Sequence, residues 1–358
     1  MRFIFKTRYQ QDIQIFKHGG QKFWFGLLTT AVLVAPLLLD NFYLGEISLV
    51  MIYAIAGIGL MLLVGYTGLV SLGHAAFLAI GAYTHAILIT YGVPFPLSLI
   101  IAAVFSGLIG AIVGLPAMRM TGIYLAIATL AFAFIVEHSI GHMKDLTGGF
   151  RGMAVSRPEM FGIDLGAPVA FYFVCLFVLF ACLMLAINIL RSPVGRAMIG
   201  IRDSEISAQS MGIDLAKTKS MAFAISAAFT GLAGGLFAHK LGYLTPDAFT
   251  LLLSIQLLLM VVVGGLGSLH GVIFGAIFIG ILPQGIAIMR DSLPPSISQI
   301  AGLEPGLFGL ILVLFLIFEP LGIYGRWRKI RNFFEEFPLY RKATHKRQKS
   351  YLRTERVR

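Results

Sequence analysis

Charge is scarce in this sequence. Only 13% of its 358 residues are Asp, Glu, Lys or Arg, whereas 58% are hydrophobic and the mean hydropathy is +0.86. A soluble domain carries about 25% charged residues. The charges also gather in short stretches between long apolar runs, which excludes an ordinary soluble domain. The pattern is typical of a chain whose solvent is lipid for most of its length.

Cysteine is also scarce, because Cys175 and Cys182 are the only two in the sequence, seven residues apart in one apolar run. If this run is helical, about 10 Å of rise separates them. A disulfide requires Cα atoms within about 7 Å, so the two cannot pair with each other. Their spacing fits neither a zinc site nor a redox motif. We expect two small buried or lipid-facing side chains.

The motifs of enzymes and nucleotide-binding proteins are missing. The sequence contains no G-x-x-x-x-G-K-[ST] phosphate loop, no H-E-x-x-H, no G-x-S-x-G and no carboxylate pair within an apolar run. We therefore expect no enzymatic activity, no cofactor and no metal. Ionisable residues such as Glu137, His239 and Glu319 fall near the ends of the runs. The centres of the apolar runs are nearly free of charged residues. This disfavours a carrier coupled to protons or sodium ions, which would need a carboxylate at mid-depth.

Long apolar runs dominate what is present. A membrane-crossing helix needs about 20 largely apolar residues. This length predicts an all-α integral membrane protein, a polytopic bundle of about ten transmembrane helices. The expected spans are Phe23–Leu39, Ile47–Tyr66, Val70–Tyr91, Leu97–Met118, Gly122–Ser139, Val169–Leu190, Ser220–Leu241, Leu251–Gly264, Leu269–Met289 and Gly306–Tyr324. The eighth is short, so a broken or tilted helix is the alternative there.

These spans divide the chain into three parts. We expect residues 1–22 to form a basic cytoplasmic N-terminal segment, 23–324 the transmembrane domain, and 325–358 a basic cytoplasmic C-terminal tail. The first span follows a long charged leader and precedes no A-x-A-like cleavage site, so we expect it to be retained.

The basic residues set the orientation. With both termini in the cytoplasm, most Lys and Arg fall on the inside, as the positive-inside rule requires. The outside segments hold only Lys144, Arg151, Arg157, Lys240 and Arg290. The net charge of +11 lies beside the spans, mostly in the tail. It therefore favours membrane lipid or a partner subunit over nucleic acid.

Two segments repeat each other. Gly68–Leu72 reads GLVSL and Gly265–Leu269 reads GLGSL, and each opens an apolar run. Paired Gly-interrupted spans are typical of transporters built from repeats. We expect interrupted helices that line a translocation pathway, because unpaired backbone groups are tolerated only against protein or water. The alternative is that these glycines only allow close packing. The candidate pathway residues are Ser71, His74, Tyr124 and Ser268.

Small residues also recur at four-residue spacing. The pairs are Gly110 with Gly114, Gly231 with Gly235, and Gly271 with Gly275. Such spacing lets the backbones of membrane helices approach closely. We expect these glycines to lie at helix–helix contacts.

The internal loop from Arg191 to Lys219 carries a pattern of its own. Asp203 can cap a short helix, Glu205 suits its first turn, and Gly212 can end it. A helix this short is unstable alone in water, so it needs a partner or the bundle. An ordinary surface loop is the alternative. The candidate residues are Arg196, Arg202, Asp203, Glu205, Ala208 and Gly212.

This loop and the residues after it resemble the coupling segment of ATP-binding-cassette (ABC) importer permeases. The closer match is the branched-chain amino acid permease family, LivM type. The other segments that carry the resemblance are Gly65–Phe77, Gly122–Leu130 after Arg119, Val263–Ser268 and the external Thr147–Gly149. The family often continues the last of these with Pro-Asn, where this chain has Phe150-Arg151.

The resemblance implies a membrane-spanning permease subunit in a bacterial cytoplasmic (inner) membrane. It would pair with a second homologous permease, two cytoplasmic ATPase subunits and a periplasmic or extracellular substrate-binding protein. The candidate residues of the internal loop would then form an ATPase-coupling loop. The resemblance favours branched-chain amino acids as the substrate. Urea, short amides or another amino acid are the alternatives. The alternatives are a secondary carrier or channel for a small polar solute and a polytopic membrane enzyme.

Overall fold

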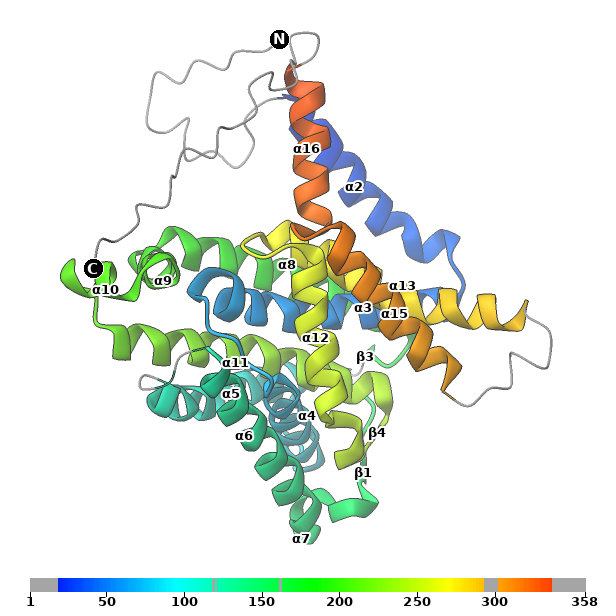
Figure 1. Cartoon of the computed structure of the whole chain (residues 1–358). Coiled ribbons are helices and arrows are strands. Elements are labelled where there is room, and N and C mark those ends of the chain that lie inside the picture. Colours follow the sequence, from blue (N-terminus) through cyan, green and yellow to red (C-terminus); the bar gives the residue numbers. More distant parts are fainter. Residues whose placement is uncertain (1–18, 118–119, 121, 161–162, 293–301, 337–358) are drawn as a thin grey trace, which may run out of the picture.

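The computed structural model describes residues 19–117, 120, 122–160, 163–292 and 302–336. The expected N-terminal segment therefore lies outside the described residues up to position 18, as do Arg119 and the tail beyond position 336. Long helices make up most of the described chain (Figure 1). They are α2 (Gly19–Leu38), α3 (Asn41–Leu60), α4 (His74–Thr90), α5 (Phe95–Ala117), α6 (Ile123–His142), α8 (Pro168–Arg191), α11 (Leu215–Leu241), α12 (Leu251–Gly264), α13 (Leu269–Asp291), α15 (Leu303–Phe318) and α16 (Gly322–Glu336).

The expectation of about ten spans agrees with these helices. Among the described residues, seven helices are long and apolar enough to cross a membrane, and a bent helix pair makes an eighth. The shorter apolar helices Lys22–Leu38 and His74–Thr90 complete the ten. The eighth expected span has the bounds of α12, and the 3₁₀ turn η3 (Pro246–Phe249) extends it to 19 residues.

Several span boundaries were wrong. The second span begins at Asn41 rather than Ile47, and the seventh begins at Leu215 rather than Ser220. The third span begins at His74 rather than Val70, because Gly68–Gly73 is not helical. The tenth ends at Phe318 rather than Tyr324, and α16 continues at a bend of 43°. Pro320 explains the break after Phe318, since proline lacks the N–H that a helix needs and disfavours a helical residue before it. Glu319 also forms an ion pair with Arg326 across the bend.

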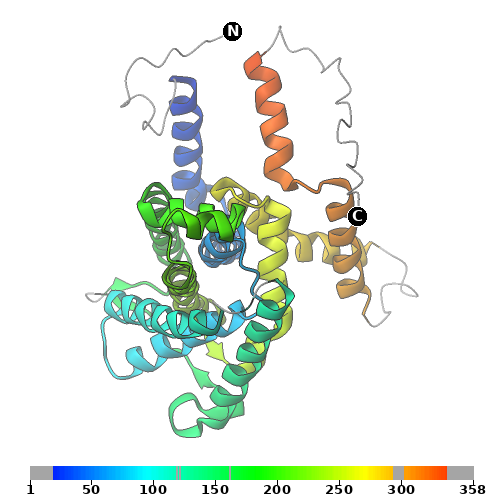
Figure 2. The same ribbon diagram turned by 60° about the vertical axis from the view of Figure 1, so that its left-hand side comes forward.

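α11 lies at the centre of the bundle, with α3, α4 and α5 packed against it. α3 also contacts α8 and α13, and α13 in turn contacts α12 and α15. Figures 1 and 2 show α2 and α16 projecting from the same side of this bundle. Cys175 and Cys182 are buried, Cys175 completely, in the main apolar core.

The expected close contacts between helices are confirmed. A Cβ on Gly110 would meet Phe223 and Ala227 of α11, and one on Gly231 would meet Ser106 of α5. One on Gly271 would meet the Gly264 backbone of α12. Without a hydrophobic effect between helices in lipid, such backbone approach supplies much of the packing energy.

The loops after α6 and α11 are joined by a short antiparallel ladder. The strand β1 (Met153–Ala154) pairs with β4 (Tyr243–Leu244), so the loop after α6 meets the loop after α11. Tyr243 also donates a hydrogen bond from its hydroxyl to the Arg151 carbonyl at 2.6 Å. The long loop further contains α7 (Lys144–Thr147), η2 (Gly149–Arg151), β2 (Glu159–Met160) and β3 (Ile163–Asp164). The expected orientation likewise places both loops on the outside.

Candidate functional site

The internal loop folds into two short helices at one end of the bundle (Figure 1). They are α9 (Pro193–Asp203) and α10 (Glu205–Ser210). Ser192 caps α9 by accepting a hydrogen bond from the Gly195 N–H at 3.4 Å. Pro193 then occupies the first turn, where its missing N–H costs nothing. Sequence reasoning expected only one helix here.

The expected cap of α10 was wrong by one residue. Ser204, not Asp203, has the extended backbone of an N-cap, and its hydroxyl accepts from the Ser207 N–H at 3.2 Å. Asp203 instead ends α9. The other end agrees with expectation, because Gly212 follows the C-cap Met211 with a positive φ of 84°.

Arg202 reaches back into the membrane bundle. Its Nη1 donates to the Gly65 carbonyl at 3.1 Å. Its Nε and Nη2 both donate to Asp203 Oδ1, at 3.1 and 2.9 Å. One carboxylate oxygen therefore orients the guanidinium fork toward Gly65.

Glu205 makes a second link to the bundle. Its Oε1 lies 2.8 Å from Nζ of Lys219, near the start of α11. The Lys219 side chain is only 1% exposed, whereas that of Glu205 is 36% exposed. A buried ammonium requires a partner of this kind, since an unpaired one would cost several kcal/mol. Sequence reasoning counted Lys219 only as an inside charge.

The remaining loop candidates lie in different surroundings. Ala208 is buried, and Arg196 donates from Nη1 to the Arg191 carbonyl at 2.9 Å within its own loop. The large apolar residues on α10 and its end are the most exposed feature of the loop. Ile206 is 84% exposed and Met211 is 83% exposed. Exposed apolar side chains grouped at a charged tip are typical of a protein-binding surface.

The first interrupted segment is held by side chains from other helices. The Leu72 N–H donates to Thr129 Oγ1 on α6 at 3.0 Å, and the Ala75 N–H donates to Ser254 Oγ on α12 at 2.9 Å. Nδ1 of His74 lies 3.0 Å from Ser71 Oγ. On the other side of the imidazole ring, Nε2 of His74 lies 2.7 Å from Ser226 Oγ on α11.

We call Ser71, His74, Thr129, Ser226 and Ser254 the polar cluster. All five side chains are buried. The cluster brings together two of the predicted pathway residues and adds three that sequence reasoning missed. A serine or threonine inside an apolar span was the available signal, but such residues can also bond to their own helix.

The other two pathway candidates lie apart from the cluster. Ser268 is buried at the N-cap of α13, where its hydroxyl accepts from the Gly271 N–H at 3.4 Å. Tyr124, near the start of α6, is 72% exposed. The second interrupted segment, Gly265–Ser268, is therefore a helix start with its own cap, as Gly265 and Gly267 have φ of 114° and 80°.

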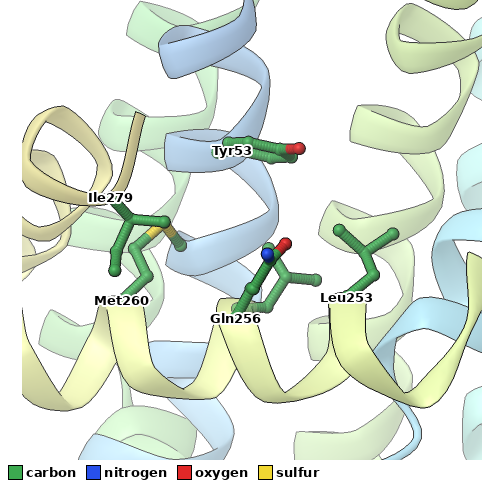
Figure 3. A pocket seen from close by; sticks show the side chains of 6 residues that line it. Tyr53, Leu253, Gln256, Met260 and Ile279 are labelled. Atoms are coloured by element: carbon green, nitrogen blue, oxygen red, sulfur yellow. The ribbon is translucent and has the colours of Figure 1, made fainter. Parts of the chain in front are cut away.

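A shallow hollow between α3, α12 and α13 contains polar atoms at mid-span (Figure 3). The hollow has no room for a water molecule, because the roughly 160 Å³ between its lining residues includes the open surroundings. Figure 3 shows the Gln256 amide of α12 pointing toward the Tyr53 ring of α3, with Leu253, Met260 and Ile279 around them. Gln256 is the eleventh of the 19 residues in Pro246–Gly264. An amide in the middle of an apolar run was a signal that sequence reasoning did not use.

The fold consists of apolar helices of membrane-crossing length, with interrupted segments buried among them and a helix pair at one end. This arrangement defines a polytopic membrane transport protein. A family model described as "Branched-chain amino acid transport system / permease component" matches residues 42–318. The chain belongs to this permease family and is a multi-pass membrane protein.

Curated relatives agree with this assignment. The chain is 34% identical to the high-affinity branched-chain amino acid transport system permease protein LivM of Escherichia coli (strain K12), over 87% of this chain and 77% of that protein. It is 33% identical to LivM of Salmonella typhimurium, over 85% and 75%. It is also 27% identical to the probable branched-chain amino acid transport permease protein LivH of Methanocaldococcus jannaschii, over 77% and 89%. No solved structure matches the chain.

Proposed function

We propose that the chain is the membrane-spanning permease subunit of an ATP-driven ABC importer that translocates branched-chain amino acids. Its partners would be a second homologous permease, two cytoplasmic ATPase subunits and an external substrate-binding protein. The observation that carries the proposal is the family match over residues 42–318. The likeness to both LivM and LivH proteins supports a pair of homologous permeases.

The ATPase would bind the tip formed by α10. Ile206 and Met211 offer it apolar contact, and Ser204 and Gly212 fix where the short helix begins and ends. Closure of the ATPase dimer would then push on α10. A ligand shifts an equilibrium only by its differential affinity for the two states, so the closed ATPase dimer would have to bind one permease conformation more tightly than the other.

The translocation pathway would pass the polar cluster and Gln256. A zwitterionic solute needs hydrogen-bond partners at mid-depth, and these side chains supply hydroxyl, imidazole and amide groups without a carboxylate. Ser268 and Tyr124 stay candidates. Close packing without any contact to solute is the competing account for Ser71 and Ser268.

Reconstitution tests the function. The permease pair with its ATPases in proteoliposomes, given the binding protein outside and ATP inside, should accumulate labelled leucine, and excess valine should compete. A non-hydrolysable ATP analogue is the control and should abolish uptake. Uptake that persists with the analogue would favour the secondary carrier or channel, and competition by urea but not valine would change the substrate class.

Cysteine substitution tests the pathway. In a Cys175→Ala/Cys182→Ala background, Ser71→Cys and Gln256→Cys should react with a small water-soluble thiol reagent faster during turnover than at rest. Saturating leucine should slow the reaction. Ser71 is buried in this conformation, so slow modification at rest is expected. Inertness of both positions in an active transporter would leave packing as their role.

A further inference from the structure

Arg202 occupies the place where the two repeated segments meet. A Cβ on Gly68 would lie 3.2 Å from Cγ of Arg202, and one on Gly267 would lie 3.5 Å from its Nη1. Gly65 and Gly267 are neighbours too, because a Cβ on Gly65 would lie 2.9 Å from the Gly267 nitrogen. The Gly267 N–H also points at Met61 Sδ, at 3.2 Å. Arg202 thus lies against both halves of the repeat, with its aliphatic stem beside Gly68 and its guanidinium beside Gly267.

The carbonyl that Arg202 binds belongs to an irregular helix. Met61–Gly65 forms the π-helical turn η1 at the end of α3, and Gly65 is its last residue. Six non-helical residues beyond Thr67 lead to His74 and the polar cluster. π turns inside α-helices are frequent at functional sites. Arg202 therefore holds the carbonyl at the entrance to the first interrupted segment.

The helix that carries Arg202 is firmly seated on the bundle. Met198 of α9 is fully buried in an apolar cluster with Leu63 of η1, Leu69 of the interrupted segment and Phe223 of α11. A displacement of α9 would therefore move these residues with it. Interiors packed in this way transmit strain rather than absorb it.

From these contacts we infer that Arg202 is a positioning residue that transmits movement of the ATPase-coupling loop to both interrupted segments, through the Gly65 carbonyl and the Gly267 backbone. The inference rests on the proposed function. It also assigns Arg202 a contact within the permease, where the sequence alone suggested an ATPase contact. Asp203 acts through Arg202 by orienting its guanidinium.

The test compares transport with ATP hydrolysis in the reconstituted complex. Arg202→Lys keeps the positive charge but cannot bind Asp203 and Gly65 together, because an ammonium lacks the planar fork. The matched control is Arg191→Lys, an exposed arginine at the end of α8 in the same loop. We expect Arg202→Lys to retain ATPase binding and ATP hydrolysis within about twofold, and to lower the leucine transported per ATP at least fivefold. The control should leave all three unchanged.

Each result decides the question. An unchanged ratio in Arg202→Lys would overturn the inference. Loss of ATPase binding alongside transport would also overturn it, by making Arg202 a partner contact. Asp203→Asn should lower the ratio in the same direction but less, and Arg202→Lys should keep the unfolding temperature of the detergent-solubilised permease. Failure of the proposed function would look different, since the unsubstituted complex would then show no ATP-dependent uptake.

Discussion

At the scale of single residues, the most consequential pair is Glu205 with the buried Lys219. Glu205→Gln leaves an ammonium buried without its counter-charge and should lower the unfolding temperature. We expect the free energy of unfolding to fall by roughly 1–3 kcal/mol. This is less than the roughly 3–5 kcal/mol typical of breaking a fully buried pair, because Glu205 is 36% exposed. Thermal unfolding of the detergent-solubilised permease measures it.

The double variant Glu205→Gln/Lys219→Met is the control for that pair. Methionine fills much of the same volume without a charge, so the double variant should regain part of the lost stability. Equal unfolding temperatures for the single variant and the unsubstituted protein would show that the pair contributes nothing.

The residue scale is also where sequence reasoning reached its limit. Arg202, Glu205 and Ser71 were recognisable as candidates from their local pattern. Their partners were not, since Arg202 meets Gly65 across 137 residues of sequence and His74 meets Ser226 across 152. No periodicity encodes such contacts. Asp203 and Ser204 were equally good caps by residue type, and only backbone geometry separates them.

At the scale of elements, the contact between α4 and α11 depends on glycine. A Cβ on Gly81 would collide with the Gly231 backbone. Gly81→Val should therefore force the helices apart and cost about 1–3 kcal/mol or more, seen as reduced yield and a lower unfolding temperature. Gly26→Val on α2 is the control, because nothing lies within 4 Å of its added carbon. Equal behaviour of the two variants would contradict this packing.

The second prediction about an element concerns α10. Ile206→Ser with Met211→Ser should weaken ATPase binding at least tenfold, because it removes the apolar contact offered by the tip, and should leave the unfolding temperature unchanged. Gln209→Ser, an exposed polar change on the same helix, is the control. Affinity of the purified ATPase for the permease in nanodiscs measures the effect, and unaltered affinity in the double variant would place the docking surface elsewhere.

Some element boundaries followed from the sequence. Run length and glycine position predicted α12 and the start of α13 at the observed residues. The start of α4 was missed because Val70 and Leu72 are apolar and look helical. The backbone N–H groups of Leu72 and Gly73 instead donate hydrogen bonds to the hydroxyls of Thr129 and Ser71, which hold this stretch in another conformation. Tertiary contacts, not local preference, decide that boundary.

At the scale of the whole molecule, orientation is the open prediction. Phe150→Cys in the external loop should be labelled from outside by an impermeant maleimide in intact cells, and Ser207→Cys on α10 only after permeabilisation. Both side chains are exposed, so access is not limited by packing. The cysteine-free Cys175→Ala/Cys182→Ala protein controls for background. Labelling of position 207 but not 150 in intact cells would invert the topology.

The π turn η1 has a geometric consequence for the whole chain. A π turn accommodates one more residue than an α turn, and one residue corresponds to a rotation of about 100° around the helix axis. Conversion of Met61–Gly65 to regular α-helix would therefore rotate the helical residues that follow it, Tyr66 and Thr67, by about 100° relative to α3. Thr67, whose hydroxyl donates to the Leu62 carbonyl at 2.8 Å, holds the wider turn in place. The single extra residue in this turn therefore sets the angle, rather than the distance, at which the chain leaves α3 toward Gly68 and the polar cluster.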